Sequence, residues 1–334
     1  MGTVYITSED AFIGKTDERL QVKANQQKLL DVPLIKVEGL VVLGRATISP
    51  AALTELLERK IPLTFLTATG KYLGKFEPEL TKNIFVRKAQ WKAMGESEKA
   101  IHVVKGFVRG KLKNYRMMLY RNQRKHGALE LGEAIRRLDH AIAPIHQTHN
   151  INSLRGLEGA GSAAYFGVFN QLLRTTSFRF EARRRRPPTD PVNALLSFGY
   201  SLLRHDVQSA VNIVGFDPYL GYLHCQYYGR PSLALDLMEE FRPLVVDAVV
   251  LSAINLGKLT PDDFTTETLS NAVLLSPAGR KVFLKLYEQK KQSEFKHPVL
   301  KRKCTYQEAF EIQARLLAKY LMGEIKKYPP LVLK

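Results

Sequence analysis

The chain has 334 residues, of which 45% are hydrophobic and 25% are charged, and its 50 Lys and Arg against 32 Asp and Glu give a net charge of +18. This composition excludes an intrinsically disordered chain and indicates a globular protein of one large domain or two ordinary ones. Two cysteines exclude a disulfide framework and a four-ligand zinc cage built from cysteine, and the charge favours a polyanionic partner, with nucleic acid first.

The N-terminal segment predicts β-strands. Val4–Thr7 and Leu20–Lys23 are short runs bounded by turn residues. Within Leu34–Glu38, apolar Ile35 and Val37 alternate with charged Lys36 and Glu38, which is typical of a strand with one face in solvent. We therefore expect this part of the chain to form a sheet that buries one side.

A hairpin and one helix complete the predicted N-terminal domain. The runs 61–66 and 72–76 flank turn residues, which predicts two antiparallel strands. Ser49 and Pro50 are an N-cap residue and a first-turn proline, and 51–60 has helical composition. We predict that residues 1–80 form a small β-rich domain.

The character of the sequence changes after about Glu79. Segments become longer with a period of 3.6 residues, and strand signals disappear. At 190–191, 260–261 and 276–277 a proline follows an N-cap residue, which predicts three helix starts. We predict an all-α domain over residues 85–334, and so a two-domain fold of the α+β class.

The sequence predicts no membrane segment. No apolar run approaches ~18 residues, the length that spans a bilayer. Glu9 and Asp10 precede any apolar run of the kind that a secretory signal needs. We therefore expect a cytoplasmic protein.

Two basic stretches are candidates for binding nucleic acid. Residues 105–125 hold eight basic side chains and no acidic one, with Tyr115 and Tyr120 among them, and a second basic stretch covers 280–303. A cationic helix face suits phosphate contacts, whereas the alternative is an ordinary solvated face. The predicted contacts are Lys105, Arg109, Lys111, Lys113, Arg116, Arg121, Lys281 and Lys285.

An acidic helix is the first candidate for chemistry. Asp236 and Glu239 are three residues apart and share a helix face, and the ring of Pro243 clashes with the carbonyl of residue 239, so the helix breaks there. With His224 just upstream, the carboxylates suit a divalent metal. An acidic surface patch paired with Arg242 fits the spacing equally well, and the sequence leaves both interpretations open.

Glu158 is the second candidate. It lies among Leu157, Gly159, Ala160 and further alanines, in a segment of helical composition. A carboxylate buried in such surroundings needs a partner. The small neighbours themselves favour close helix packing.

Four blocks of the chain, in order, resemble the CRISPR adaptation integrases, the first-numbered family of CRISPR-associated proteins. They are LEG at 157–159, NALLSFGY at 193–200, GFDPYLGYLH at 215–224 and SLALDLMEEFRP at 232–243. The N-terminal stretches 32–34, 41–44 and 61–67 are similar to that family's β domain, so the resemblance covers nearly the whole chain.

The resemblance implies that Glu158, His224 and Glu239 hold magnesium or manganese, with Asp236 close by as an outer carboxylate or an occasional ligand. Relatives often have Asp where this chain has Glu239, and either side chain supplies a hard oxygen.

The resemblance also implies an activity. The 3′-hydroxyl of a short double-stranded DNA fragment attacks a phosphodiester of the CRISPR repeat, and with water as the nucleophile the same site is a nuclease. The family acts as homodimers that are bridged by the second-numbered CRISPR-associated protein, in the cytoplasm of prokaryotes. The competing hypothesis is a non-catalytic DNA-binding scaffold in which the acidic helix is structural.

Overall fold

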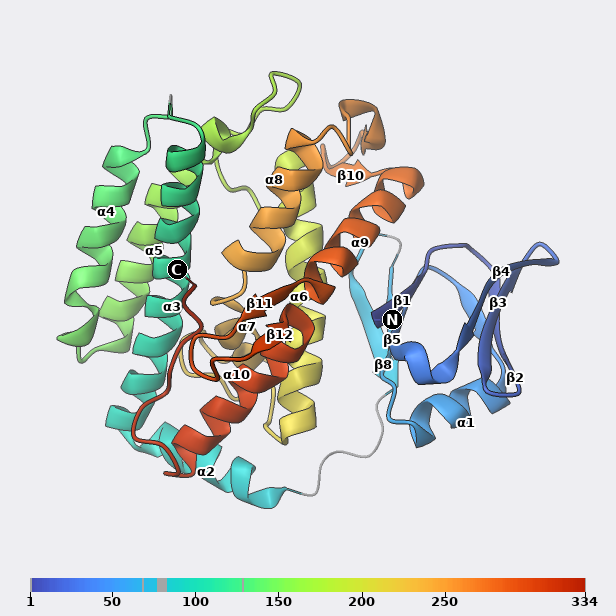
Figure 1. Ribbon diagram of the computed structural model, residues 1–334, viewed down its shortest axis with the longest axis horizontal. Helices are drawn as coiled ribbons and strands as arrows, with labels where there is room; N and C mark the ends of the chain where they lie inside the picture. Colours follow the sequence, from blue (N-terminus) through green and yellow to red (C-terminus); the bar gives the residue numbers. More distant parts are fainter. Residues whose placement is uncertain (1, 68, 77–82, 128, 334) are drawn as a thin grey trace.

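A computed structural model describes residues 2–67, 69–76, 83–127 and 129–333. A strand-rich N-terminal region is followed by a larger helical region, and the two lie side by side (Figure 1). The predicted α+β class is confirmed. The predicted boundary at residues 79–80 lies outside the described residues.

The strand-rich region contains two four-stranded sheets. The first sheet has the order β1 (Gly2–Ile6), β5 (Val37–Leu43), β7 (Leu63–Leu66), β8 (Tyr72–Phe76). Its first three strands are parallel, and β8 is antiparallel to β7. The second sheet has the order β4 (Gln27–Pro33), β3 (Arg19–Ala24), β2 (Ala11–Thr16), β6 (Ala46–Ile48).

The predicted hairpin and helix are confirmed. Strands β7 and β8 pair as expected, and helix α1 (Pro50–Glu58) begins at Ser49, whose hydroxyl accepts from the N–H of Ala52.

The strand predicted at 34–38 is wrong. Residues Leu34–Lys36 form a short 3-10 helix, η1, and β5 begins only at Val37. The chain must turn here because β4 and β5 belong to different sheets. The 3-10 turn buries Leu34 and Val37, three residues apart, and leaves Ile35 86% exposed. The alternation of apolar and charged residues here therefore comes from a 3-10 turn and not from a strand.

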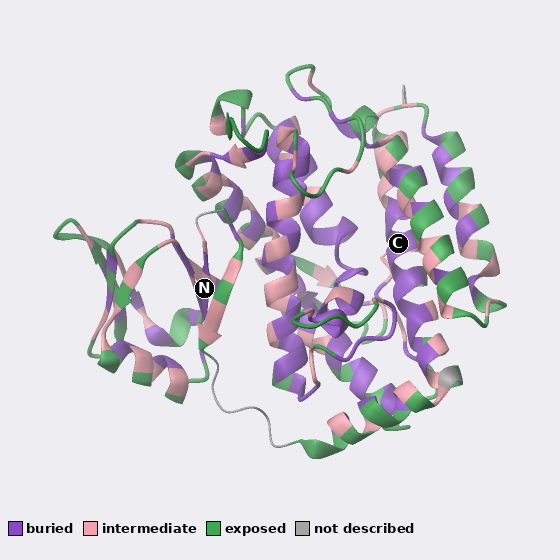
Figure 2. Ribbon diagram, turned by 180° about the vertical axis from the view of Figure 1, so that it is seen from behind, coloured by how far each residue is buried: buried purple, intermediate pink, exposed green. Residues whose placement is uncertain are grey.

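The helical region is built around long helices. α3 packs against α4 and α5, and α6 packs against α7 and α10. Figure 2 shows buried residues running through the central helices and exposed residues along the outer ones. The helices are α2 (Ile84–Gly95), α3 (Ser97–Lys125), α4 (Gly132–Ile142), α5 (Ile151–Gly167), α6 (Pro191–Val214), α7 (Ser232–Met238), α8 (Ala248–Asn255), α9 (Pro277–Gln292) and α10 (Tyr306–Leu321), with short 3-10 helices at Ala143–His146, Phe169–Leu172 and Pro261–Asp263.

Two of the three predicted helix starts are confirmed. Asp190 caps α6 and Ser276 caps α9, each followed by proline at the first helical position. At Thr260 the chain forms only the 3-10 turn Pro261–Asp263, because it then enters strand β9 (Phe264–Thr266), which pairs with β10 (Val273–Leu275). A second hairpin joins β11 (Glu294–Lys296) and β12 (Lys303–Thr305), so strand signals were missed in this region.

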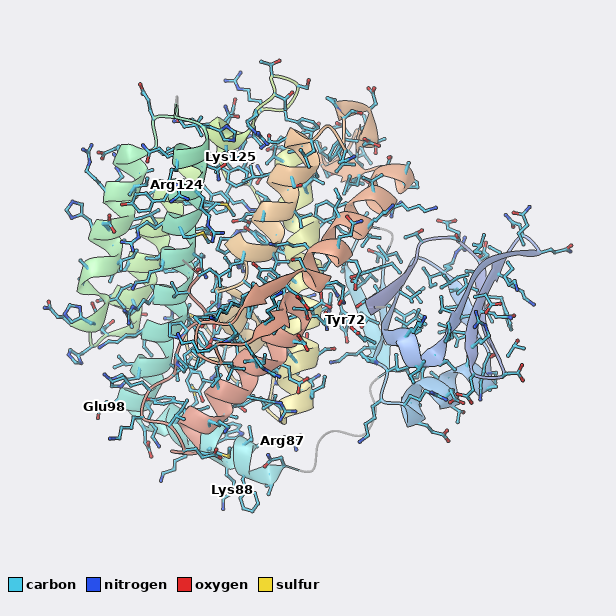
Figure 3. All side chains as sticks on the ribbon, viewed as in Figure 1. Tyr72, Arg87, Lys88, Glu98, Arg124 and Lys125 are labelled. Atoms are coloured by element: carbon cyan, nitrogen blue, oxygen red, sulfur yellow. The ribbon has the colours of Figure 1, made fainter. Side chains whose placement is uncertain are left out.

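A buried charge cluster joins the two regions. Lys291 of α9 has no exposed surface, and its ammonium lies 3.1 Å from a carboxylate oxygen of Asp206 and 3.1 Å from one of Glu288. It also donates to the hydroxyl of Thr3 in β1, whose N–H donates to Glu288. A second contact between the regions is made by Tyr72 of β8, which Figure 3 labels: its ring stacks on that of His205 of α6 with centroids 4.9 Å apart.

Among the described residues, no helix combines the length and the apolar character that crossing a membrane requires.

Replacing Lys291 by Met tests the cluster that joins the two regions. The variant leaves the partly buried carboxylates of Asp206 and Glu288 without their cation, so we expect the free energy of unfolding to fall by up to about 3–5 kcal/mol. Denaturant unfolding measures it, and Lys285→Met, an exposed position on the same helix, is the matched control. Equal stability of the two variants would show that the cluster does not hold the regions together.

Candidate metal centre

Three helices and one loop bring the predicted chemical residues together. Glu158 extends from α5, Glu239 follows the end of α7, and His224 lies in the loop between α6 and α7. His224 Nε2 lies 3.7 Å from Oε1 of Glu239. The ammonium of Lys111 on α3 pairs with Glu158 and lies 2.7 Å from Oε2 of Glu239. The two glutamates therefore meet around one lysine.

The position of Glu158 depends on close packing of α5 against α3. A Cβ added at Gly161 would collide with Cδ2 of Leu112, so a larger residue here would push the Leu112 side chain out of its place between the two helices. Ser162, one turn after Glu158, donates to its Oε1 at 2.9 Å. The small residues of this segment thus allow close helix packing, as the sequence predicted. They also place the Glu158 carboxylate beside α3.

Asp236 holds His224 in one orientation. Its Oδ2 accepts the backbone N–H groups of Tyr222 and Leu223, and its Oδ1 accepts that of His224 and contacts the ring Nδ1 at 2.7 Å. Because a carboxylate accepts, the ring proton belongs on Nδ1, and Nε2 is left as the acceptor that faces Glu239. Asp236 is fully buried, and both of its oxygens are occupied by these four contacts. This geometry favours the outer role for Asp236.

Glu239 is a buried carboxylate held in the ionised form. Burial opposes its charge, but the neighbouring charges, that of Arg242 first and then that of Lys111, outweigh burial and lower the pKa of Glu239 to about 2. Arg242 lies 3.2 Å from its Oε1 and stacks over the ring of Tyr200 at 4.6 Å. The pairing with Arg242 that the sequence allowed is present, but it is buried and not a surface patch.

The predicted helix break is confirmed. α7 ends at Met238, and a π-helix at Pro243–Asp247 precedes α8. Asp247, within this π-helix, accepts from Tyr200 at 2.5 Å, and burial raises the pKa of its carboxyl to about 6.

The donor set suits a hard divalent cation. The site offers two carboxylates and an imidazole nitrogen, and Oε2 of Glu239 is buried without a hydrogen-bond partner among the described residues. Within the described ranges, however, no three His, Cys, Asp or Glu side chains are arranged as a metal's ligands. The ammonium of Lys111 occupies the space between the carboxylates.

The predicted DNA-binding residues lie in different settings. Arg109 and Arg121 are exposed on α3, and Lys281 and Lys285 are exposed on α9. Lys113 is partly buried, and burial with the charges of Arg109 and Arg116 lowers its pKa.

Three of the predicted side chains are already engaged within the protein. Lys105 donates to the carbonyl of His146, Arg116 pairs with Asp139, and Lys111 is buried between the carboxylates. The positive charge of α3 is concentrated away from its start, since Arg124 and Lys125 lie at one end and Glu98 at the other (Figure 3).

Lys111 was predicted as an exposed DNA contact but is buried, and the sequence holds a signal for that burial. Val104, Val108, Lys111 and Tyr115 follow helical 4-3-4 spacing, and the other three are buried. A lysine in a buried stripe needs a carboxylate partner. That pattern separates Lys111 from the exposed basic residues of the same helix.

Comparison with known proteins identifies relatives of this chain. The profile of the family described as CRISPR associated protein Cas1 matches residues 4–289. The "CRISPR-associated endonuclease Cas1 2" of Rhodospirillum rubrum is 39% identical over 99% of this chain and 98% of that protein.

Solved structures agree with this match. A Cas1 protein from Thermotoga maritima has a TM-score of 0.79 at 26% identity, covering 97% of both chains. A chain of a Cas6-RT-Cas1–Cas2 complex has a TM-score of 0.81 at 26% identity, covering 100% of this chain and 36% of that chain.

Replacing Gly221 by Ala tests how the loop holds His224. The added Cβ would lie 2.6 Å from the backbone carbon of Ser232 and 2.8 Å from Oδ2 of Asp236, so the loop must move away from α7. We expect a loss of about 1–3 kcal/mol in the free energy of unfolding. Gly159→Ala, in helix α5 with nothing within 4 Å of the new Cβ, is the control and should stabilise slightly. A Gly221 variant as stable as the control would refute the tight packing.

Proposed function

The chain belongs to the Cas1 family of CRISPR-associated proteins and is an enzyme of its endonuclease and integrase type, and from this premise we propose a specific reaction. The enzyme joins the 3′-hydroxyl ends of short double-stranded DNA fragments into a CRISPR array by metal-dependent phosphoryl transfer. With water in place of the hydroxyl, the same site cleaves DNA.

The contacts that link Glu158 to Glu239 through Lys111, and Glu239 to His224, are the observation that supports this proposal. These three side chains would hold magnesium or manganese through two carboxylates and Nε2 of His224. A bound divalent ion supplies Lewis acidity toward the phosphate and lowers the pKa of the attacking hydroxyl. Neither magnesium nor manganese is favoured over the other by this donor set.

The surrounding residues prepare the three ligands. Asp236 keeps the ring proton on Nδ1, so that Nε2 stays available. Arg242, fixed over the Tyr200 ring, directs one oxygen of Glu239 and leaves the other to the centre. Because Glu239 stays ionised far below neutral pH, its oxygen needs no deprotonation step before it binds a cation.

We propose the domain roles that the sequence predicted. Residues 1–80 form a dimerisation domain, and residues 85–334 form the catalytic domain. The DNA fragment and the repeat contact the basic residues of α3 and α9, and a Cas2 protein bridges two dimers. The likeness to a chain of a Cas6-RT-Cas1–Cas2 complex supports the last partner.

A non-catalytic DNA-binding scaffold is the second candidate. It is favoured by one observation: Lys111 and Arg242 already neutralise the glutamates, as a purely structural charge cluster requires. The two candidates differ in one observable: only the enzyme cleaves and joins DNA strands when metal is added.

Replacing His224 by Ala separates the two candidates. Loss of one of three ligands should lower the rate of manganese-dependent cleavage and strand joining on branched DNA by about 100-fold or more. The fold and DNA affinity should persist, because the ring is partly exposed. His146→Ala, whose ring contacts only the carbonyl of Ala143 among the described residues, is the control. Undiminished activity in the His224 variant would overturn the ligand assignment.

Neutralising Arg109 and Lys113 with Gln tests the α3 surface. We expect weaker DNA binding across all sequences and a salt dependence whose slope falls by about one for each lost phosphate contact. Binding titrations over a range of salt concentrations measure both. Arg315→Gln on α10, where the guanidinium pairs with Glu311, is the control. An unchanged slope would remove α3 from the DNA interface.

A further inference from the structure

We propose that Lys111 is a displaceable internal cation: its ammonium holds Glu158 and Glu239 together in the metal-free protein, and the divalent ion takes its place on binding. This inference rests on the proposed metal site. It assigns to Lys111 a role distinct from that of the exposed basic residues on α3.

The ammonium of Lys111 lies between two carboxylates and contacts both. Nζ of Lys111 hydrogen-bonds to Oε1 of Glu158 and lies 2.7 Å from Oε2 of Glu239. The side chains of Lys111 and Glu239 are each 4% exposed, so water screens their contact little, whereas that of Glu158 is 25% exposed. While the ammonium contacts both carboxylates, no second cation can bind between the same oxygens.

The two cations of the site differ in how firmly they are held. Arg242 binds Oε1 of Glu239 and stacks on the Tyr200 ring at 4.6 Å, so a planar contact and an ion pair fix it together. The Lys111 ammonium lies 5.5 Å from the ring of Tyr115 and is carried on a flexible four-carbon stem. Lys111 is therefore the cation that can leave.

The charges of the site favour replacement of the Lys111 ammonium by a divalent ion. Glu158, Glu239 and Asp236 carry three negative charges, and Lys111 with Arg242 carries two positive ones. A divalent ion among the same oxygens repels the ammonium that occupied them. The displaced Lys111 ammonium stays near the centre because its stem is only four carbons long. There it can pair with a phosphate that the ion holds.

Manganese affinity without DNA measures the exchange directly. In Lys111→Met no internal cation competes, so we expect Mn²⁺ to bind at least about tenfold more tightly than to the unaltered protein, by calorimetry. The same variant should melt at a lower temperature in chelator, because its carboxylates repel, and should gain more from added Mn²⁺.

Lys111→Arg gives the opposite result. Its planar guanidinium pairs with both carboxylates at once and is harder to displace, so we expect weaker Mn²⁺ binding with little loss of stability in chelator. This variant decides the question if the Met variant does not fold. Lys319→Met, at an exposed position on α10 whose ammonium pairs with Glu324, is the control and should bind Mn²⁺ as the unaltered protein does.

The outcomes separate this inference from the proposed function. If the unaltered protein binds Mn²⁺ and Glu158→Gln does not, the metal site stands. Equal affinities in the Met, Arg and unaltered proteins would then overturn the exchange alone. An unaltered protein that binds no Mn²⁺ at its glutamates overturns both.

Discussion

Two glutamates from separate helices share one lysine ammonium inside the protein, and the arrangement of the candidate centre depends on that contact. Lys111 on α3 joins Glu158 on α5 to Glu239 after α7. Burying these charges is costly unless each has partners. The surrounding structure supplies them through Ser162, Arg242 and the close approach of α5 at Gly161.

The proposed chemistry depends on side chains that are held in single orientations. Asp236 uses both oxygens to fix the 222–224 backbone and the ring of His224, so the imidazole presents one nitrogen only. The Tyr200 ring fixes Arg242, and Arg242 fixes one oxygen of Glu239. The Lys111 ammonium, carried on a flexible four-carbon stem, is the group of this cluster that we propose to move when an ion binds.

Much of the fold was predictable because local signals agreed with the tertiary structure: Ser49, Asp190 and Ser276 each cap a helix that begins with proline. Prediction failed where tertiary context decides, as at 34–36, where a change of sheet forces a turn. The metal-ligand candidates came from a family resemblance and from acidic residues on one helix face. The pairing of Lys111 was missed, because its depth depends on the packing of α3 against α5 and α7.

Crystals soaked in Mn²⁺ and measured for anomalous scattering test the central claim most directly. The account predicts a single strong peak among the Glu158 carboxylate, Nε2 of His224 and the Glu239 carboxylate, with the Lys111 ammonium moved off both glutamates. A peak elsewhere, or full Mn²⁺ loading with the ammonium still between the two carboxylates, would contradict it.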